Sequence, residues 1–116
     1  MNKHHIRKPT HPGTVLDEHY IKPLELNLDE LAQRLGIARN TLFKIRTGKA
    51  SVTPHLALSL AKAFDTTPQL WLNLQQKYDL WMEQNMGVHH RVIQIIKDGM
   101  FLPVPQNLAL RKRMAA

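Results

Sequence analysis

The sequence contains no cysteine, which excludes disulfide bridges and thiolate metal sites. Its apolar runs are only a few residues long, well short of a membrane span, although hydrophobic residues make up 43% of the chain and favour a folded protein. The opening MNKHHIRKPTHPG is basic and lacks the apolar stretch of a secretory signal. We therefore expect the 116 residues to form one domain in a reducing, cytoplasmic compartment.

Acidic side chains are missing from a long central stretch. Between residues 39 and 64 there is no Asp or Glu, whereas the same stretch holds the cations Arg39, Lys44, Arg46, Lys49 and Lys62. Five of the nine acids instead lie within the first thirty residues, namely Asp17, Glu18, Glu25, Asp29 and Glu30. With a net charge of +7, this asymmetry indicates either a positive surface for a polyanion or a solvated basic face.

Cap and proline signals divide the first three quarters of the chain into five predicted helices. Asn27, followed three residues later by Glu30, predicts a capping box, and the Thr-Pro pairs before residues 54 and 68 predict two further helix starts. We expect helices over 12–20, 28–35 and 39–47, and two more that begin at Pro54 and Pro68. Short helices with tight connections predict an all-α, five-helix bundle.

The chain ends are less regular. We assign residues 1–10 to a basic arm, 11–84 to the helical domain and 85–116 to a C-terminal extension. The arm carries Lys3, Arg7 and Lys8, and it either follows DNA or is disordered. In the extension, RVIQIIKDG fits a helix or a strand, LPVPQN predicts an extended linker, and LALRKRMAA predicts a basic tail.

The segments 28–35 and 39–47, joined through Gly36, have the spacing of a helix-turn-helix. Glycine permits the sharp turn, and Ile37, Leu42 and Ile45 anchor the second helix against the first. The N-terminal residues of that helix then project outward, where a major groove can accept them.

The residue types on this outward side suit DNA. Arg39 can pair with guanine and Asn40 with adenine, and Lys44 lies on the same side of the helix. Thr41 is a candidate backbone contact, and Arg46, Lys49 and Ser51 are placed to hold phosphates. An exposed Phe43 would pack against thymine methyl groups, or it folds back into the core. If this segment is instead an ordinary helix with a basic outer face, these cations face solvent.

The segment from Pro12 to about Trp81 resembles the Xre-type helix-turn-helix of bacterial and phage repressors, and in particular the HigA family of antitoxins. The motifs HPG, ELAQRLGI, TGK, TP…ALSLAKAF, TTP and WLNLQQKYDLW carry the likeness, in order and at matching spacings. Ala38 departs from the family pattern, which usually has a capping Ser or Thr at this position. The missing side-chain cap costs about 1 kcal/mol of helix stability.

The resemblance implies a dimer that binds an operator palindrome, represses its own operon and neutralises a HigB-type, mRNA-cleaving toxin. By position, base contacts would fall to Arg39, Asn40 and Lys44, and backbone contacts to Thr41, Arg46 and Lys49. The acidic residues of the first two helices would suit a basic toxin. A stand-alone repressor without a toxin is the alternative, and a protein-interaction adaptor is a third.

The fifth helix is the candidate dimer interface, because its apolar residues spread over more than one face: Leu70, Trp71, Leu72, Leu74, Tyr78, Leu80, Trp81 and Met82. The C-terminal extension could instead cover the surplus face. We expect no enzyme, since the neighbouring acids Asp17–Glu18 and Asp29–Glu30 point about 100° apart. We also expect no metal or cofactor, since His4–His5 and His89–His90 lack a third ligand.

Overall fold

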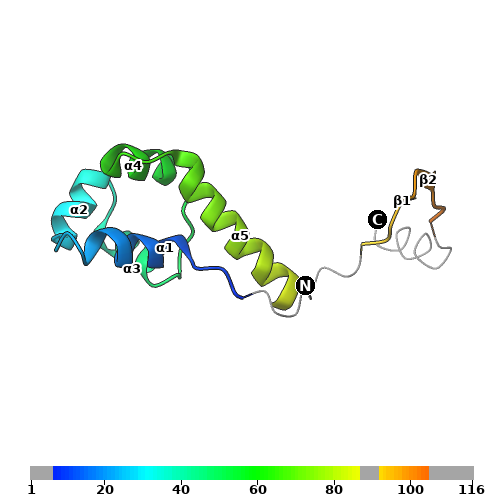
Figure 1. Ribbon diagram of the computed structural model, residues 1–116, viewed down its shortest axis with the longest axis horizontal. Coiled ribbons are helices and arrows are strands. Elements are labelled where there is room, and N and C mark those ends of the chain that lie inside the picture. The colour runs from blue at the N-terminus through cyan, green and yellow to red at the C-terminus, as the bar shows by residue number, and fades with distance from the viewer. Residues whose placement is uncertain (1–6, 87–91, 105–116) are drawn as a thin grey trace. The chain divides into compact units, whose positions relative to one another are not determined.

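The computed structural model describes residues 7–86 and 92–104 (Figure 1), which belong to two compact units, 1–86 and 87–116. Lys3, both histidine pairs and the basic tail at 108–116 lie outside the described residues, so the interpretations placed on them stay predictions. The last helix of the first unit ends at Met86, two residues beyond the domain boundary drawn from the sequence.

The first unit is built from helices, which confirms the five-helix prediction. They are α1 (Pro12–Leu16), continued by a π-helical turn η2 (Asp17–Ile21), then α2 (Leu28–Leu35), α3 (Arg39–Arg46), α4 (Pro54–Phe64) and α5 (Pro68–Met86). The π-helical turn was not predicted, although the first helix ends ahead of Pro23 as expected. In the part of the chain that the structure describes, no helix has the length and apolar character needed to cross a membrane.

Side chains cap the helices where the sequence places cap residues. The Asn27 side chain accepts a hydrogen bond from the Glu30 amide at 3.0 Å, which is one half of the predicted capping box. Thr53 and Thr67 accept from the amides three residues on, at 3.2 Å each. The first helix has the cap His11, whose ring accepts from the Gly13 amide.

The core of this unit is one cluster contributed by all five helices. Trp71 of α5 is fully buried in this cluster, together with the predicted apolar stripes of α2 and α4. Its buried hydrophobic members are Leu16, Ile21, Leu31, Ala32, Leu35, Leu42, Ile45, Val52, Leu56, Ala57, Leu60 and Trp71. Burial of this cluster fixes how the helices pack and therefore which faces remain outside.

The described part of the second unit is a β-hairpin. Its strands β1 (Ile96–Lys97) and β2 (Met100–Phe101) are antiparallel, with Ile96 opposite Phe101. Asp98 and Gly99 form the turn with φ of 51° and 77°, the left-handed conformation of a two-residue hairpin turn. Within RVIQIIKDG, only Ile96–Lys97 form a strand, and the described residues 92–95 before it are neither helix nor strand. The helix alternative is wrong for the described residues of this segment.

Candidate nucleic-acid interface

α3 is held by its apolar side and leaves its polar side in solvent. Leu42 and Ile45 are buried against α1 and α2, and Ile37 packs beside them. Gly36 adopts a φ of 71°, the left-handed conformation that turns the chain between α2 and α3. On the opposite side, the exposed residues are Arg39, Asn40, Thr41, Phe43 and Lys44. The structure thus brings together the three predicted base contacts.

The start of α3 lacks a side-chain cap. Ala38 has the extended backbone of a cap residue, with φ −69° and ψ 149°, but makes no side-chain hydrogen bond. The helix nevertheless begins at Arg39 as predicted. Its first amides are therefore left for solvent or for an anion such as phosphate.

Arg39 has an intramolecular partner that is easily exchanged. Its Nη1 donates to Asp29 Oδ1 at 3.0 Å, and the two side chains are 61% and 67% exposed. An ion pair this exposed contributes at most about 1 kcal/mol. The guanidinium can therefore give up Asp29 for a bidentate acceptor such as guanine at small cost.

Arg46 is placed differently from the prediction. Its Nε and Nη2 donate to Asp17 Oδ1 at 3.1 and 2.9 Å, and the side chains are only 23% and 17% exposed. The charge is thus neutralised inside the protein, between the end of α3 and η2. The predicted phosphate contact finds no support in this geometry, because the guanidinium has its partner already.

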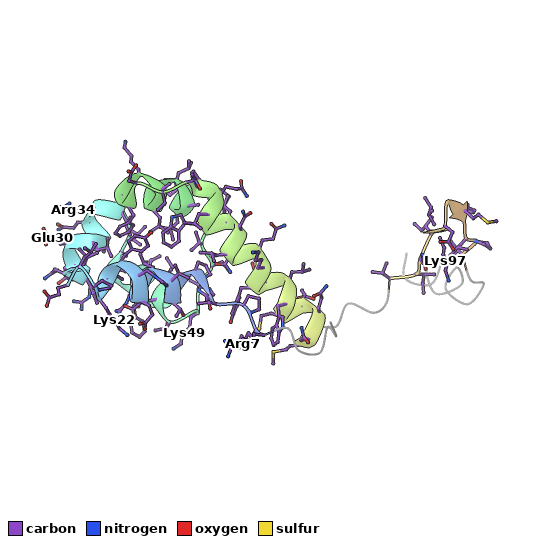
Figure 2. All side chains as sticks on the ribbon, viewed as in Figure 1. Arg7, Lys22, Glu30, Arg34, Lys49 and Lys97 are labelled. Atoms are coloured by element: carbon purple, nitrogen blue, oxygen red, sulfur yellow. The ribbon has the colours of Figure 1, made fainter. Side chains whose placement is uncertain are left out.

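The residues after α3 continue the outer face. Phe43 is 50% exposed, so of its two alternatives the core position is wrong. The Lys49 ammonium lies 6.0 Å from the Phe43 ring centre, and Figure 2 shows Lys49 on the same lower edge of the first unit as α3. Ser51 and His55 are exposed as well. Lys49 and Ser51 therefore extend the polar face of α3 without entering the core.

The acidic residues of the first two helices are compensated by cations of the same unit. Asp17 pairs with Arg46, Glu18 with Lys22 at 2.8 Å, and Glu30 with Arg34 at 3.8 Å, a pair visible in Figure 2. Asp29 has Arg39. The expected acidic surface for a basic toxin is thus largely neutralised, because each of these acids has a partner on a neighbouring turn or helix. Glu30 therefore belongs to the predicted capping box and also forms an ion pair with Arg34 through its side chain.

Comparison with known proteins agrees with this geometry. A helix-turn-helix family model matches residues 19–71. The HTH-type transcriptional regulator YbaQ of Escherichia coli is 39% identical over 114 residues, which cover 97% of this chain and 96% of YbaQ. Antitoxin HigA-1 of Vibrio cholerae is 34% identical over 79 residues, 68% of this chain and 74% of the antitoxin. The solved structure of antitoxin GraA in complex with its operator has 35% identity and a TM-score of 0.65, and covers 81% of this chain and all of GraA.

The chain belongs to the HigA family of Xre-type helix-turn-helix proteins. The resemblance stated from the motifs is thereby confirmed, and with it the DNA-binding character of the family. The likeness to YbaQ extends through the C-terminal extension, whereas the likeness to HigA-1 is confined to a shorter segment.

Sequence reasoning missed two buried polar residues in this HigA-family protein. Gln75 of α5 accepts from the Val52 amide at 2.8 Å and donates to Asp79 at 2.8 Å. His11 is 7% exposed and hydrogen-bonded, and burial lowers the pKa of its ring. One signal was available: Gln75 follows the buried Trp71 by four residues and so lies on the same helix face.

Proposed function

We propose that this HigA-family protein is a sequence-specific antitoxin of a type II toxin–antitoxin module, which represses its own operon as a dimer in the cytoplasm. The observation that carries the proposal is the outward face of α3. It presents Arg39, Asn40 and Lys44 on a helix that Leu42 and Ile45 fix in the core. A rigid helix with these side chains fits a major groove.

The side chains of that face would make different contacts with a duplex. Arg39 would donate to the two acceptors of guanine in place of Asp29, and Asn40 would read adenine. Lys44 reaches a base edge or a phosphate. Thr41 and Lys49 would contact the backbone and fix the register of the helix. Arg46 is left out of this set because Asp17 holds it.

A dimer would form through α5. A surface cavity of about 570 Å³ lies along this helix, and its apolar wall includes Val52, Leu72 and the 56%-exposed Leu80. The other lining residues are polar: Gln69, Gln75, Gln76, Asp79 and Glu83. Protein interfaces combine exposed apolar side chains with polar ones, and one recognition helix alone reads too few base pairs for an operator.

The toxin is the part of the proposal that depends on relatives. HigA-1 and GraA are named antitoxins, and GraA was solved with its operator. YbaQ is called a transcriptional regulator, which keeps the stand-alone repressor as the alternative. Expression of the native operon with a tag on this chain separates the two: an mRNA-cleaving protein encoded next to it co-purifies only if the chain is an antitoxin.

The DNA-binding half is tested on a duplex that the wild-type protein selects from a random oligonucleotide pool. Arg39→Ala should weaken binding by roughly 5- to 150-fold (about 1–3 kcal/mol) and relax the preference at one position of each half-site. Lys49→Ala should weaken binding to all sequences alike and reduce the salt slope by about one.

Lys62→Ala is the matched control for lost charge. Lys62 lies on α4, across the unit from α3 in Figure 1, and it should leave the affinity for the selected duplex within about twofold. Wild-type affinity in both Arg39→Ala and Lys49→Ala would show that α3 is not the reading helix.

A further inference from the structure

α1 is the element that joins the recognition helix to the proposed dimer helix. Among the packed pairs of helices in the first unit, α1 contacts both α3 and α5. The distance between the two reading helices of a dimer must match half-sites about 34 Å apart. The contacts at α1 therefore affect the distance between the two reading helices, on which operator binding depends.

His11 stands at the start of α1 and contacts all three parts of this junction. Its Nδ1 accepts from the Gly13 amide at 2.9 Å and so caps α1. The ring also lies beside the segment that follows α3, since a Cβ on Gly48 would be 3.7 Å from it and the Ala50 backbone raises its pKa. The same ring lies edge-on to Tyr78 of α5, with ring centres 4.8 Å apart and planes at 84°.

Two glycines lie at this close approach. A Cβ at Gly13 would overlap the backbone carbonyl of Ile45, near the end of α3. A Cβ at Gly48, where φ is 77°, would lie 3.7 Å from the His11 ring. Gly13 of HPG is therefore required for the start of α1 to pack against the end of the recognition helix, whereas Gly48 of TGK supplies the left-handed backbone beside the His11 ring.

We propose that His11 is a positioning residue for operator binding, whose neutral imidazole holds the end of α3 against α1 and α5. This proposal rests on the operator-binding function proposed above. A proton on Nδ1 would face the Gly13 N–H, a donor against a donor, and the cap on α1 would be lost. Acid should then loosen the reading helix relative to the dimer helix.

The charges around the ring decide the sign. Burial lowers the pKa of His11, and this effect prevails over Asp79 on α5 and the Ala50 backbone, which raise it. Lys8 packs over the same Tyr78 ring at 5.3 Å and adds a positive charge on that side. The folded state thus prefers neutral His11. Its contribution to stability is complete above the unfolded pKa of about 6.5 and is lost as the pH falls through the folded pKa.

The experiment measures affinity for the wild-type-selected duplex between pH 8 and pH 5 at constant ionic strength, with circular dichroism at each pH. Below the folded pKa of His11, the dissociation constant of the wild type should rise by up to about tenfold per pH unit. His11→Asn keeps an acceptor for the Gly13 amide but cannot titrate, so its affinity should be lower at pH 8 and should not fall further in acid.

His55→Asn supplies the matched control, since it makes the same substitution at an exposed histidine in the first turn of α4. This variant should keep the loss of affinity in acid that the wild type shows. An acid-induced loss of the same size in His11→Asn overturns the proposal.

A second measurement separates this proposal from the DNA-binding function and does not need a folded variant. Amide and imidazole NMR signals of the wild type should show His11 titrating below pH 6.5, together with the amides of Ile45, Gly48 and Ala50 and the ring of Tyr78. If the wild-type protein selects no duplex from the random pool at pH 8, the proposed function is wrong. Titration of His11 without any response in the segment after α3 refutes its positioning role.

Discussion

The Asp17 carboxylate neutralises the charge of Arg46 at the end of the recognition helix. It accepts two hydrogen bonds from Arg46 at 2.9 and 3.1 Å in a largely buried setting. Asp17→Asn leaves the Arg46 guanidinium without its counter-ion, so we expect a loss of about 2 kcal/mol in unfolding free energy. Urea denaturation followed by circular dichroism measures it.

Glu18→Gln is the matched control, since Glu18 neighbours Asp17 in sequence and also has a cationic partner. The Glu18–Lys22 pair is exposed and screened by solvent, so its loss should leave stability close to that of the wild type. Equal effects of the two substitutions would show that burial of the Asp17–Arg46 pair has no energetic weight.

At this scale the sequence predicts what each residue is able to do, but not which partner it meets. The outward positions of Arg39, Asn40 and Lys44 followed from helical periodicity, because buried Leu42 and Ile45 define the opposite face. The pairing of Arg46 with Asp17 could not be predicted in this way. The two residues lie 29 positions apart, and only the packing of α3 on the first helix brings them together.

The weakest point of α3 is its uncapped start. Ala38 already has the extended backbone that a cap residue needs, so a serine hydroxyl there can accept from the amide of Asn40 or Thr41. Ala38→Ser should raise the unfolding free energy by about 1 kcal/mol. Thermal and urea denaturation both measure this gain.

Ala63→Ser tests whether the gain is specific to a cap position. Ala63 is exposed in the last turn of α4, where serine is a poorer helix former than alanine, and stability should fall by a few tenths of a kcal/mol. If Ala38→Ser were neutral or destabilising, the first turn of α3 would already be satisfied by another group.

Helices with strong caps and apolar stripes were predictable as elements, because local sequence decides both features. The π-helical turn η2 was not, since nothing in the sequence DEHYI distinguishes it from an ordinary last turn. The hairpin was open between two alternatives, yet Asp98–Gly99 between apolar residues is itself a strong hairpin signal. Weighing that turn more heavily than the apolar period would have identified it.

At the scale of the whole molecule, the described residues of the two units differ in burial. Among the described residues, every buried side chain lies between His11 and Gln75, whereas the hairpin exposes apolar residues such as Ile96 and Phe101. In the part of the chain that the structure describes, the buried core therefore belongs to the helical unit. The extension is a feature shared with YbaQ.

The proposed operator binding requires a dimer, and α5 offers the most direct test of how that dimer forms. Leu80 is 56% exposed beside Asp79, so a glutamate at this position would place further negative charge in the proposed interface. Leu80→Glu should raise the dimer dissociation constant at least tenfold, measured by sedimentation equilibrium. Affinity for a palindromic duplex should fall with it, while affinity for a single half-site stays the same.

Leu58→Glu makes the same chemical change at a residue of α4 that is 60% exposed and lies away from the α5 cavity. This variant should remain a dimer with wild-type affinity for the palindrome. Were Leu80→Glu to sediment as the wild type does, the copies would have to meet through another surface. The two reading helices would then be spaced by contacts other than those of α1 and α5, and the role argued for His11 would have to act within one protomer alone.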